Sequence, residues 1–314
     1  MKTIVITGAN SGIGLEVTRQ LAEDKNKHLL LGCRDTRKAQ SRIDKIKASS
    51  GNKHLTVIPL DLSSFSSIRS FTKGVIEASA TIDVLACNAG LQIPTGTKVS
   101  KEGFEETFAV NVLGHFLLTK LLLPHIHKPS GRIVLTSSGT HFNPPIWQSR
   151  MFGMPGANYK GWKEISSPDG FRDYKEGKRG FARYSTSKLC TLLFGYELDK
   201  KLQCTDAKIT INMFDPGLMP GTGLARETSP AQQWMWKNVM PVMRIFNGIN
   251  SVQTSSKNLS ALIADAKFDK ITGKYFEEQK VKPSSNDSYN TDYQKDLWEG
   301  CEHLIGEPFE PENM

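Results

Sequence analysis

A glycine-rich turn near the start of the chain restricts the possible folds more than any other feature of the sequence. Before it, the run Thr3–Thr7 is apolar and rich in β-branched residues, as buried strands are. The turn carries Gly8, Gly12 and Gly14, and apolar residues then recur with helical spacing. Strand, turn and helix in this order predict a βαβ unit whose turn cradles a phosphate group.

The three glycines suit a dinucleotide better than a plain connecting loop, which is the alternative. Gly8 permits the tight turn, Gly12 lets a pyrophosphate approach the backbone, and Gly14 lets the helix pack closely on the sheet. The helix start adds free N–H groups and the positive end of the helix dipole. The predicted cofactor contacts in this segment are Gly8, Asn10, Ser11, Gly12, Ile13 and Gly14.

The rest of the chain alternates short apolar runs with helical patterns. This alternation predicts an α/β fold: one doubly wound, Rossmann-type domain with a parallel sheet of about seven strands between two helical layers. Residues 1–276 are expected to form this domain and residues 277–314 an extension with a short helix. Expected strands are Thr3–Thr7, His28–Gly32, Leu55–Pro59, Val84–Cys87, Arg132–Thr136, Lys208–Phe214 and Gly273–Phe276. Expected helices include Ser66–Ala78, Phe104–Leu123, Tyr184–Leu202 and Ser251–Ala264.

The charge and the cysteines restrict the class of partner. A net charge of +8 and a pI of about 9.1 raise the possibility of nucleic-acid binding. The basic residues are spread along the chain without interleaved aromatics, so we expect a solvated basic surface and no nucleic-acid partner. The five cysteines are scattered and contain no C-x-x-C pair, which predicts reduced thiols and no metal site.

No apolar run approaches the roughly 20 residues that span a bilayer. The first strand begins at residue 2 or 3, which leaves no room before it for a signal peptide or anchor. We therefore expect a cytoplasmic protein without an integral membrane segment. Peripheral membrane contact and the oligomeric state stay open.

Tyr184 and Lys188 lie one helical turn apart in a predicted helix, so both side chains share one face. A nearby cation favours the phenolate and brings a phenol, whose usual pKa is about 10, toward acid–base chemistry at neutral pH. Taken alone the spacing is a weak signal, because surface helices contain it by chance. It gains weight from the glycine-rich turn.

The glycine spacing G-x-x-x-G-x-G and the Tyr–Lys pair together resemble the short-chain dehydrogenase/reductase family. Three further segments also resemble family motifs, in the family order, over residues 1 to about 275. The chain is therefore identified as a member of that family. The three segments are Asn88, Ala89 and Gly90 after the fourth strand, Asn111 in the following helix, and Thr136, Ser137 and Ser138 after the fifth strand.

The resemblance implies a role for each of four residues. Tyr184 donates a proton to the substrate oxygen as hydride arrives, and Lys188 lowers the tyrosine pKa and holds the nicotinamide ribose. Ser138 stabilises the negative charge on that oxygen, and Asn111 orders a water that links Lys188 to solvent. Ser137 competes for the serine role, but the strand alignment favours Ser138. Singly, these residues also fit structural roles such as a core amide or a strand-end hydroxyl.

The end of the second strand bears on the choice of cofactor. Cys33 occupies the place where NAD-preferring relatives carry an aspartate, and Arg34 offers a fork suited to a 2′-phosphate. We therefore predict NADPH (NADP+). Asp35 complicates this, unless it faces solvent as a partner of Arg37 or Lys38. By resemblance, further contacts come from Asp61 and Leu62 at the adenine, and from Pro216, Gly217 and Thr222 at the carboxamide, where simple turns are the alternative.

Two segments are expected to shape the substrate site. The flap 139–183 is rich in aromatic residues, and a structureless loop of that length predicts a functional flap or short helices. The loop 216–250 carries Trp234, Met235, Trp236, Met240, Met243 and Phe246, which suit a bulky apolar ligand. Core packing, a dimer surface or a membrane-facing patch would use the same residues.

Several stretches resemble the retinol dehydrogenase and protochlorophyllide reductase-like branch of the family. Leu218 stands where protochlorophyllide reductases carry a cysteine, and Val112 replaces their histidine, which puts light-driven pigment reduction in doubt. We expect an NADPH-dependent oxidoreductase that acts on the carbonyl or alcohol of a lipophilic substrate. The alternatives are a C=C reductase and a catalytically silent protein that senses NADP(H).

Overall fold

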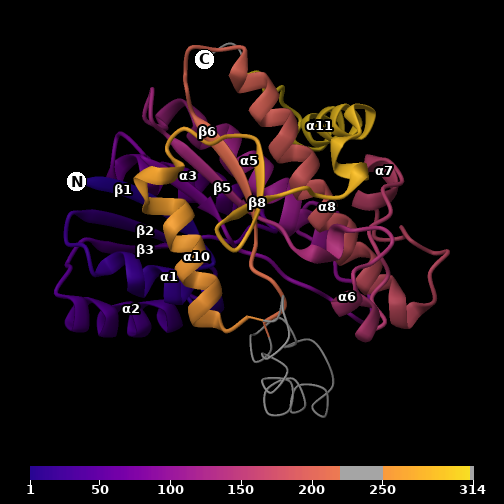
Figure 1. Cartoon of the computed structure of the whole chain (residues 1–314), viewed down its shortest axis with the longest axis horizontal. Helices are drawn as coiled ribbons and strands as arrows, with labels where there is room; N and C mark the ends of the chain where they lie inside the picture. Colours follow the sequence, from indigo (N-terminus) through magenta and orange to yellow (C-terminus); the bar gives the residue numbers. More distant parts are fainter. Residues whose placement is uncertain (220–249, 312–314) are drawn as a thin grey trace.

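The chain folds into a three-layer α/β/α arrangement, seen in a computed structural model that describes residues 1–219 and 250–311 (Figure 1). Its sheet has eight strands in the order β3-β2-β1-β4-β5-β6-β7-β8. Seven strands are parallel, and β8 pairs antiparallel with β7. The doubly wound, Rossmann-type fold expected from the sequence is confirmed.

The strands lie within two residues of their predicted bounds at either end. An eighth strand was not predicted, because its Lys-Val-Lys sequence is polar and all three residues are exposed at the sheet edge. The strand order reverses at β1 and β4, which places a ligand crevice at their carboxyl ends. The strands are β1 Lys2–Thr7, β2 Lys27–Cys33, β3 Leu55–Pro59, β4 Val84–Cys87, β5 Arg132–Thr136, β6 Thr210–Asp215, β7 Lys274–Glu277 and β8 Lys280–Lys282.

The helices follow the predicted pattern with two differences. The expected helix Phe104–Leu123 contains a π-helical stretch, η1 (Ala109–Leu113). Helix α8 begins well before Tyr184, over residues whose two glycines lower the helix propensity. The helices are α1 Gly12–Ala22, α2 Thr36–Ser50, α3 Phe65–Ala78, α4 Glu106–Phe108, α5 Gly114–Leu122, α6 Trp147–Met151, α7 Trp162–Ser166, α8 Glu176–Gln203, α10 Val252–Ala264 and α11 Thr291–Ile305.

A hydrophobic core lies on each face of the sheet. One joins the sheet to α3, α5, α8 and α11, and the other joins it to α1, α2 and α10. Along β1, Val5 belongs to the first core while Ile4 and Ile6 belong to the second. This alternation follows the two-residue period of a strand and explains why a strand buried on both faces is apolar throughout.

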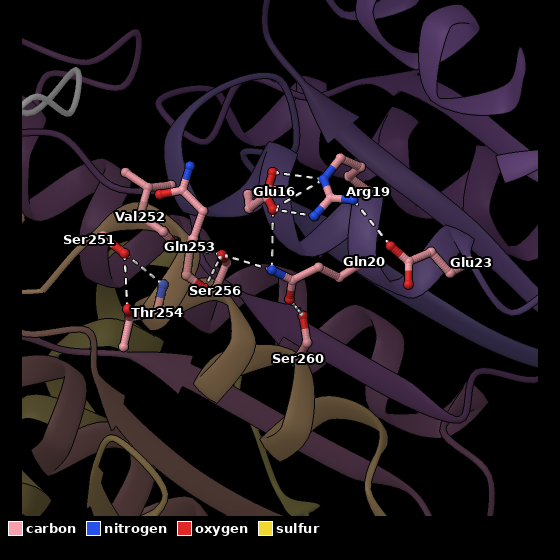
Figure 2. Close-up of polar contacts among 10 residues, drawn as sticks. All are labelled: Glu16, Arg19, Gln20, Glu23, Ser251, Val252, Gln253, Thr254, Ser256 and Ser260. Atoms are coloured by element: carbon pink, nitrogen blue, oxygen red, sulfur yellow. Dashed lines mark hydrogen bonds and ion pairs between the residues drawn. The ribbon is translucent and has the colours of Figure 1, made fainter. Parts of the chain in front are cut away.

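Helix α10 is fixed against α1 by polar contacts (Figure 2). The Gln20 amide donates to Ser256 Oγ at 3.2 Å and accepts from Ser260 Oγ at 2.9 Å. From the same helix, Ser255 Oγ donates to the carbonyl of Pro216 at 2.6 Å. These contacts hold the turn after β6 in a fixed position relative to the helix that follows the glycine-rich turn.

One helical stretch, Glu106–His125, is the single candidate for a membrane span within residues 1–219 and 250–311. Of its most apolar window, 83% is buried inside the protein. A helix that is apolar on all sides is expected where it is packed on all sides. The stretch is therefore weak evidence for a membrane span.

Candidate active site

The carboxyl ends of four neighbouring strands bring the predicted site segments together. Helix α8 and the π-helical stretch η1 place their residues against these strand ends. The segments are the glycine-rich turn after β1, Asn88–Gly90 after β4, Ser138 after β5, Pro216–Gly217 after β6, Asn111 in η1, and Tyr184 with Lys188 on α8.

The backbone of the glycine-rich turn favours glycine at all three positions, for reasons that differ between them. Gly8 and Gly12 have left-handed φ angles of 71° and 53°. A Cβ on Gly14 would lie 2.4 Å from the carbonyl oxygen of Gly8. No atom lies within 4 Å of the Cβ position of Gly12, and Ser11 makes no side-chain capping bond at the start of α1. This leaves open space and N–H groups for a pyrophosphate.

Thr7 joins this turn to the segment after β4, a role that the sequence did not reveal. Its hydroxyl oxygen accepts hydrogen bonds from the backbone N–H groups of Asn88 and Ala89, both at 2.9 Å. The Asn88 side chain returns a bond to the Thr7 carbonyl at 3.0 Å. Two segments 81 residues apart in the sequence are therefore joined by three hydrogen bonds.

His115 continues this network into the active site. Its Nε2 lies 3.0 Å from the Thr7 hydroxyl, which donates to it because the other ring nitrogen faces a carbonyl and must carry the proton. Nδ1 then carries the ring proton and donates to the carbonyl of Asn111 at 3.3 Å. Burial lowers the pKa of His115 to about 4, so the ring is neutral at pH 7. Its place on an apolar helix gave no signal of this role.

Asn111 holds the Asn88–Gly90 segment against α8. Its Oδ1 accepts from the N–H of Leu91 at 2.9 Å, and its Nδ2 donates to Leu91 O at 3.0 Å and to Ser187 Oγ at 2.9 Å. A Cβ on Gly90 would lie 3.4 Å from Asn111 Oδ1 and 3.5 Å from Lys188 Nζ. The side chain thus brings this segment close to Lys188, while the ordered water stays a prediction.

The structure separates the two competing serines. The Ser138 side chain lies close enough to the Tyr184 hydroxyl to lower the tyrosine pKa, although burial outweighs this effect. Ser137 is buried and donates to the backbone carbonyl of Lys188 at 2.9 Å. Ser138 is therefore the serine placed beside Tyr184, whereas Ser137 fixes α8 to β5.

The pKa values of Tyr184 and Lys188 differ from the expected pattern. Lys188 Nζ donates to Thr136 O at 2.9 Å and lies 5.8 Å from the centre of the Tyr184 ring. Burial lowers the pKa of Lys188 to about 8, and Asp215 partly offsets this. Burial also raises the pKa of Tyr184, against the expectation that the lysine lowers it. The reason is that a phenolate loses more solvation in the buried site than its neighbours return.

His141 contacts the backbone of Ser138, a role that sequence reasoning also missed. Its Nδ1 lies 2.7 Å from the carbonyl of Ser138, and its Nε2 accepts from the N–H of Ser285 at 3.1 Å. Burial lowers the pKa of His141 to about 4. The C-terminal extension, to which Ser285 belongs, therefore helps to hold the segment of the candidate serine.

This geometry agrees with the matches to known proteins. A family model described as short chain dehydrogenase matches residues 2–150. Protochlorophyllide reductase from Avena sativa is 32% identical over 321 residues, covering 96% of this chain and 99% of that protein. The chain belongs to the short-chain dehydrogenase/reductase family. Retinol dehydrogenase 13 from Homo sapiens is 30% identical, covering 97% of this chain and 85% of its own.

Solved structures share the short-chain dehydrogenase/reductase fold. An uncharacterized protein from Mycobacterium paratuberculosis has a TM-score of 0.70 at 24% identity, covering 98% of this chain and 95% of its own. A short chain dehydrogenase from Burkholderia cenocepacia, in complex with NADP, has a TM-score of 0.63 at 19% identity, covering 88% and 95%. At these identities the likeness concerns the fold alone.

The second strand of this short-chain dehydrogenase/reductase ends in an exposed basic cluster. The Asp35 carboxylate caps α2 by accepting from the backbone N–H of Lys38 at 3.0 Å. Arg34, Arg37 and Lys38 line a surface pocket together with Asp35 and Thr36. The acidic residue that complicated the cofactor prediction is thus engaged at the start of its own helix. The basic side chains and the start of α2 give this surface a positive charge that favours an anionic group.

The remaining predicted cofactor contacts are the residues after β3 and after β6. Asp61 Oδ1 accepts from both the N–H and the hydroxyl of Ser63, at 3.0 and 2.7 Å, so its turn role is observed. Leu62 is buried beside it. Gly217, after Pro216, has a φ of 73°, which favours glycine. Thr222 and the apolar residues of the 216–250 loop from Trp234 to Phe246 lie outside the described residues.

The flap 139–183 contains short helices, one of the two expected alternatives. Two hydrogen bonds join it to α8 beside the Tyr–Lys pair: Ser185 Oγ donates to Pro155 O at 2.9 Å, and Asn158 N donates to Thr186 Oγ1 at 3.0 Å.

Within residues 1–219 and 250–311, no group of three or more His, Cys, Asp or Glu side chains is arranged to hold a metal.

Proposed function

We propose that this chain is an NADPH-dependent oxidoreductase that transfers a hydride between the nicotinamide and a carbonyl or alcohol of a lipophilic substrate. The observation that carries the proposal is that buried Tyr184 and Lys188 lie together at the strand ends, with Lys188 Nζ 5.8 Å from the tyrosine ring centre and 3.5 Å from the position of a Cβ on Gly90. A protein that only senses the dinucleotide would have no need of a proton donor placed in this way. Membership of the short-chain dehydrogenase/reductase family supports the oxidoreductase class.

The preference for NADPH is supported by the charges after β2. Arg34 is exposed at the end of the strand, and the carboxylate of Asp35 is engaged by the start of α2. An arginine fork beside a helix start favours a 2′-phosphate. Three structures of similar fold were solved with NADP, and one 3-ketoacyl reductase with NADH.

The residues of the site have complementary roles in this reaction. The cofactor, when bound, supplies or accepts the hydride. Tyr184 donates its proton to the substrate oxygen, and Ser138 hydrogen-bonds the same oxygen and stabilises its negative charge. Because burial raises the pKa of Tyr184, the phenol keeps its proton at neutral pH, which suits reduction. Lys188 holds the cofactor ribose and returns a proton toward Tyr184.

The lipophilic substrate class is supported by two observations. Curated relatives are named for retinol and for protochlorophyllide. On the flap, Trp147 and Met151 lie one helical turn apart and are 47% and 43% exposed. Apolar side chains exposed on a flap suit an apolar ligand or a membrane surface.

The proposal is tested by mixing the purified protein and NADPH with a panel of aldehydes, ketones and quinones. We expect NADPH oxidation with lipophilic carbonyls, slowed by roughly a hundredfold or more in the Tyr184→Phe variant. Tight NADPH binding without consumption by any substrate would instead indicate a sensing protein.

Protochlorophyllide-type C=C reduction is the second candidate, supported by the 32% identity to the Avena sativa enzyme. Illumination of the protein with NADPH and the pigment would produce chlorophyllide absorbance if this candidate is right. Because Leu218 stands where protochlorophyllide reductases carry a cysteine, we expect no such absorbance.

We also propose a cytoplasmic location. The five free cysteines, four of them buried, suit a reducing compartment. Cell fractionation tests this location, and flotation with lipid vesicles tests peripheral membrane contact.

A further inference from the structure

Asp215, the last residue of β6, is a buried carboxylate beside the active site that the proposed mechanism does not use. It is 6% exposed. Oδ2 accepts from the Tyr275 hydroxyl and Oδ1 from the N–H of Gly217, both at 2.9 Å. The backbone of Gly139 lies beside the same carboxylate and lowers its pKa. Three segments that follow or flank the candidate site therefore converge on one side chain.

Both hydrogen bonds come from donor groups, which an ionised carboxylate accepts. They satisfy its oxygen atoms but leave its negative charge without compensation, and an unpaired buried charge is costly. Lys188 supplies the opposite charge. Its Nζ donates to Thr136 O at 2.9 Å, and Thr136 on β5 is the register partner of Phe214, the residue before Asp215. Burial raises the pKa of Asp215 and lowers the pKa of Lys188, and the attraction between the two charges offsets part of each shift.

The other titratable neighbours do not replace Lys188 in this role. Glu277, the register partner of Asp215 on β7, carries a charge of the same sign, so it cannot neutralise the Asp215 carboxylate. His141 packs edge-on against Tyr275 with ring centres 5.1 Å apart, and its lowered pKa keeps it neutral at pH 7. Tyr184 is acted on by Asp215, which raises its pKa. The Asp215–Lys188 pair is thus the charge balance of the site.

We propose that Asp215 is a positioning residue: its carboxylate is the buried counter-charge of Lys188 and joins the Ser138–Gly139 turn to the Pro216–Gly217 turn. The space around it is tight, since a Cβ on Gly139 would lie 3.0 Å from Oδ2. The consequence for catalysis rests on the proposed function. With Asp215 ionised, Lys188 keeps its ammonium and Tyr184 keeps the proton that it donates.

The charge pairing is tested without any substrate. Lysine labelled with 13C at Cε is titrated by NMR in the whole chain, and the Lys188 signal is identified by its loss in Lys188→Arg. Asp215→Asn should move the Lys188 midpoint from about pH 8 downward. A shift of about one pH unit is expected for a pair several ångströms apart at an effective dielectric constant near 20 to 40.

Two variants control for other causes. Asp215→Glu keeps the charge, so its Lys188 midpoint should stay closer to that of the wild type than the midpoint of Asp215→Asn does. Glu277→Gln removes the neighbouring carboxylate of β7 and should leave the midpoint unchanged. If Asp215→Asn does not fold, as judged by circular dichroism, Asp215→Ser removes the charge with a smaller side chain.

An unchanged Lys188 midpoint in the folded, charge-removing variant overturns the proposal, whatever the activity. Absence of carbonyl turnover in the wild type overturns the proposed function and leaves the NMR result standing. Where turnover is measurable, the pH profile of alcohol oxidation by Asp215→Asn should move to lower pH in the same direction as the Lys188 midpoint. A role limited to packing would lower the rate without moving the profile.

Discussion

At the scale of single residues, the Tyr184 hydroxyl is the group whose removal tests the chemistry most directly. Tyr184→Phe keeps the ring in its buried site and removes the proton, so folding and NADPH affinity should persist. Turnover should fall roughly a hundred- to ten-thousand-fold, the usual size of general acid catalysis. Lys188→Ala should lose turnover and also weaken the cofactor. The double variant should be little worse than either single one, because residues that act as a unit are not additive.

Steady-state rates and cofactor titration by fluorescence measure these effects. Tyr184→Phe that retains most of its activity on the true substrate would place the proton donor elsewhere. Additive losses in the double variant would show that the two residues act separately.

Arg34 carries the prediction about cofactor choice. Arg34→Ala should weaken NADPH by about 1.5–3 kcal/mol, the range for a hydrogen bond to a charged group, and leave NADH nearly unchanged. NADH lacks the 2′-phosphate and so serves as the internal control in the same binding assay. Equal losses for the two cofactors would show that Arg34 has only a structural role.

At the scale of elements, the shape of the glycine-rich turn depends on the close packing of Gly14, in the first turn of α1, against Gly8 and Asn88. Gly14→Ala places a Cβ 2.4 Å from Gly8 O and 2.6 Å from Asn88 Nδ2, so the helix must move away from the turn. We expect lost NADPH binding and a destabilisation of about 1–3 kcal/mol, typical of overpacking. Calorimetry and urea unfolding measure the two effects.

Gly177→Ala is the matched control, because this helical glycine has no atom within 4 Å of its Cβ position. Alanine is there the better helix former by about 1 kcal/mol. A Gly14→Ala variant that binds NADPH as well as Gly177→Ala does would show that the turn tolerates displacement.

The stability of the region where α5 meets η1 should depend on pH, because His115 of α5 is buried there. The His115 pKa is lowered by burial to about 4 in the folded state, against about 6.5 in the unfolded chain. Between these values the unfolded chain binds more protons, so stability falls as the pH drops from about 6.5 to about 4. The difference amounts to roughly 3 kcal/mol. Urea unfolding across this range should show a smaller loss for His115→Asn, and an identical slope in both proteins would contradict the assignment.

At the scale of the whole molecule, the C-terminal extension completes the core around α8. The ring of Trp298 lies 5.0 Å from Phe116, 6.0 Å from Phe194 and 4.9 Å from Phe309 between ring centres. Asp296 accepts from the Tyr159 hydroxyl of the flap at 2.6 Å. The extension therefore supports both the helix of the Tyr–Lys pair and the flap.

Trp298→Ala should lower the free energy of unfolding by about 3–5 kcal/mol, as large-to-small core substitutions do. Val281→Ala, at a residue of the same extension that is 50% exposed, should change it little. Urea unfolding of both variants gives the comparison. Similar small losses would mean that α11 contributes no essential part of the core.

Local patterns in the sequence determined most of the fold. These patterns were the β-branched runs, the helical spacing of apolar residues and the glycines of the first turn. Each involves residues within a few positions of one another, so each could be recognised in the sequence alone. The same holds for the Tyr184–Lys188 spacing, which a helix fixes by itself. The roles of the candidate site residues were carried by resemblance to a family and stay predictions.

Only the tertiary structure decided which polar groups meet and how strongly burial acts on them. The Thr7–His115–Asn111 network and the Asp215–Lys188 pair join residues far apart in the chain. The pKa of Tyr184 rises because packing on all sides removes water, which the helical spacing to a lysine does not reveal. Desolvation and long-range contact are properties of the folded whole, and no local pattern encodes them.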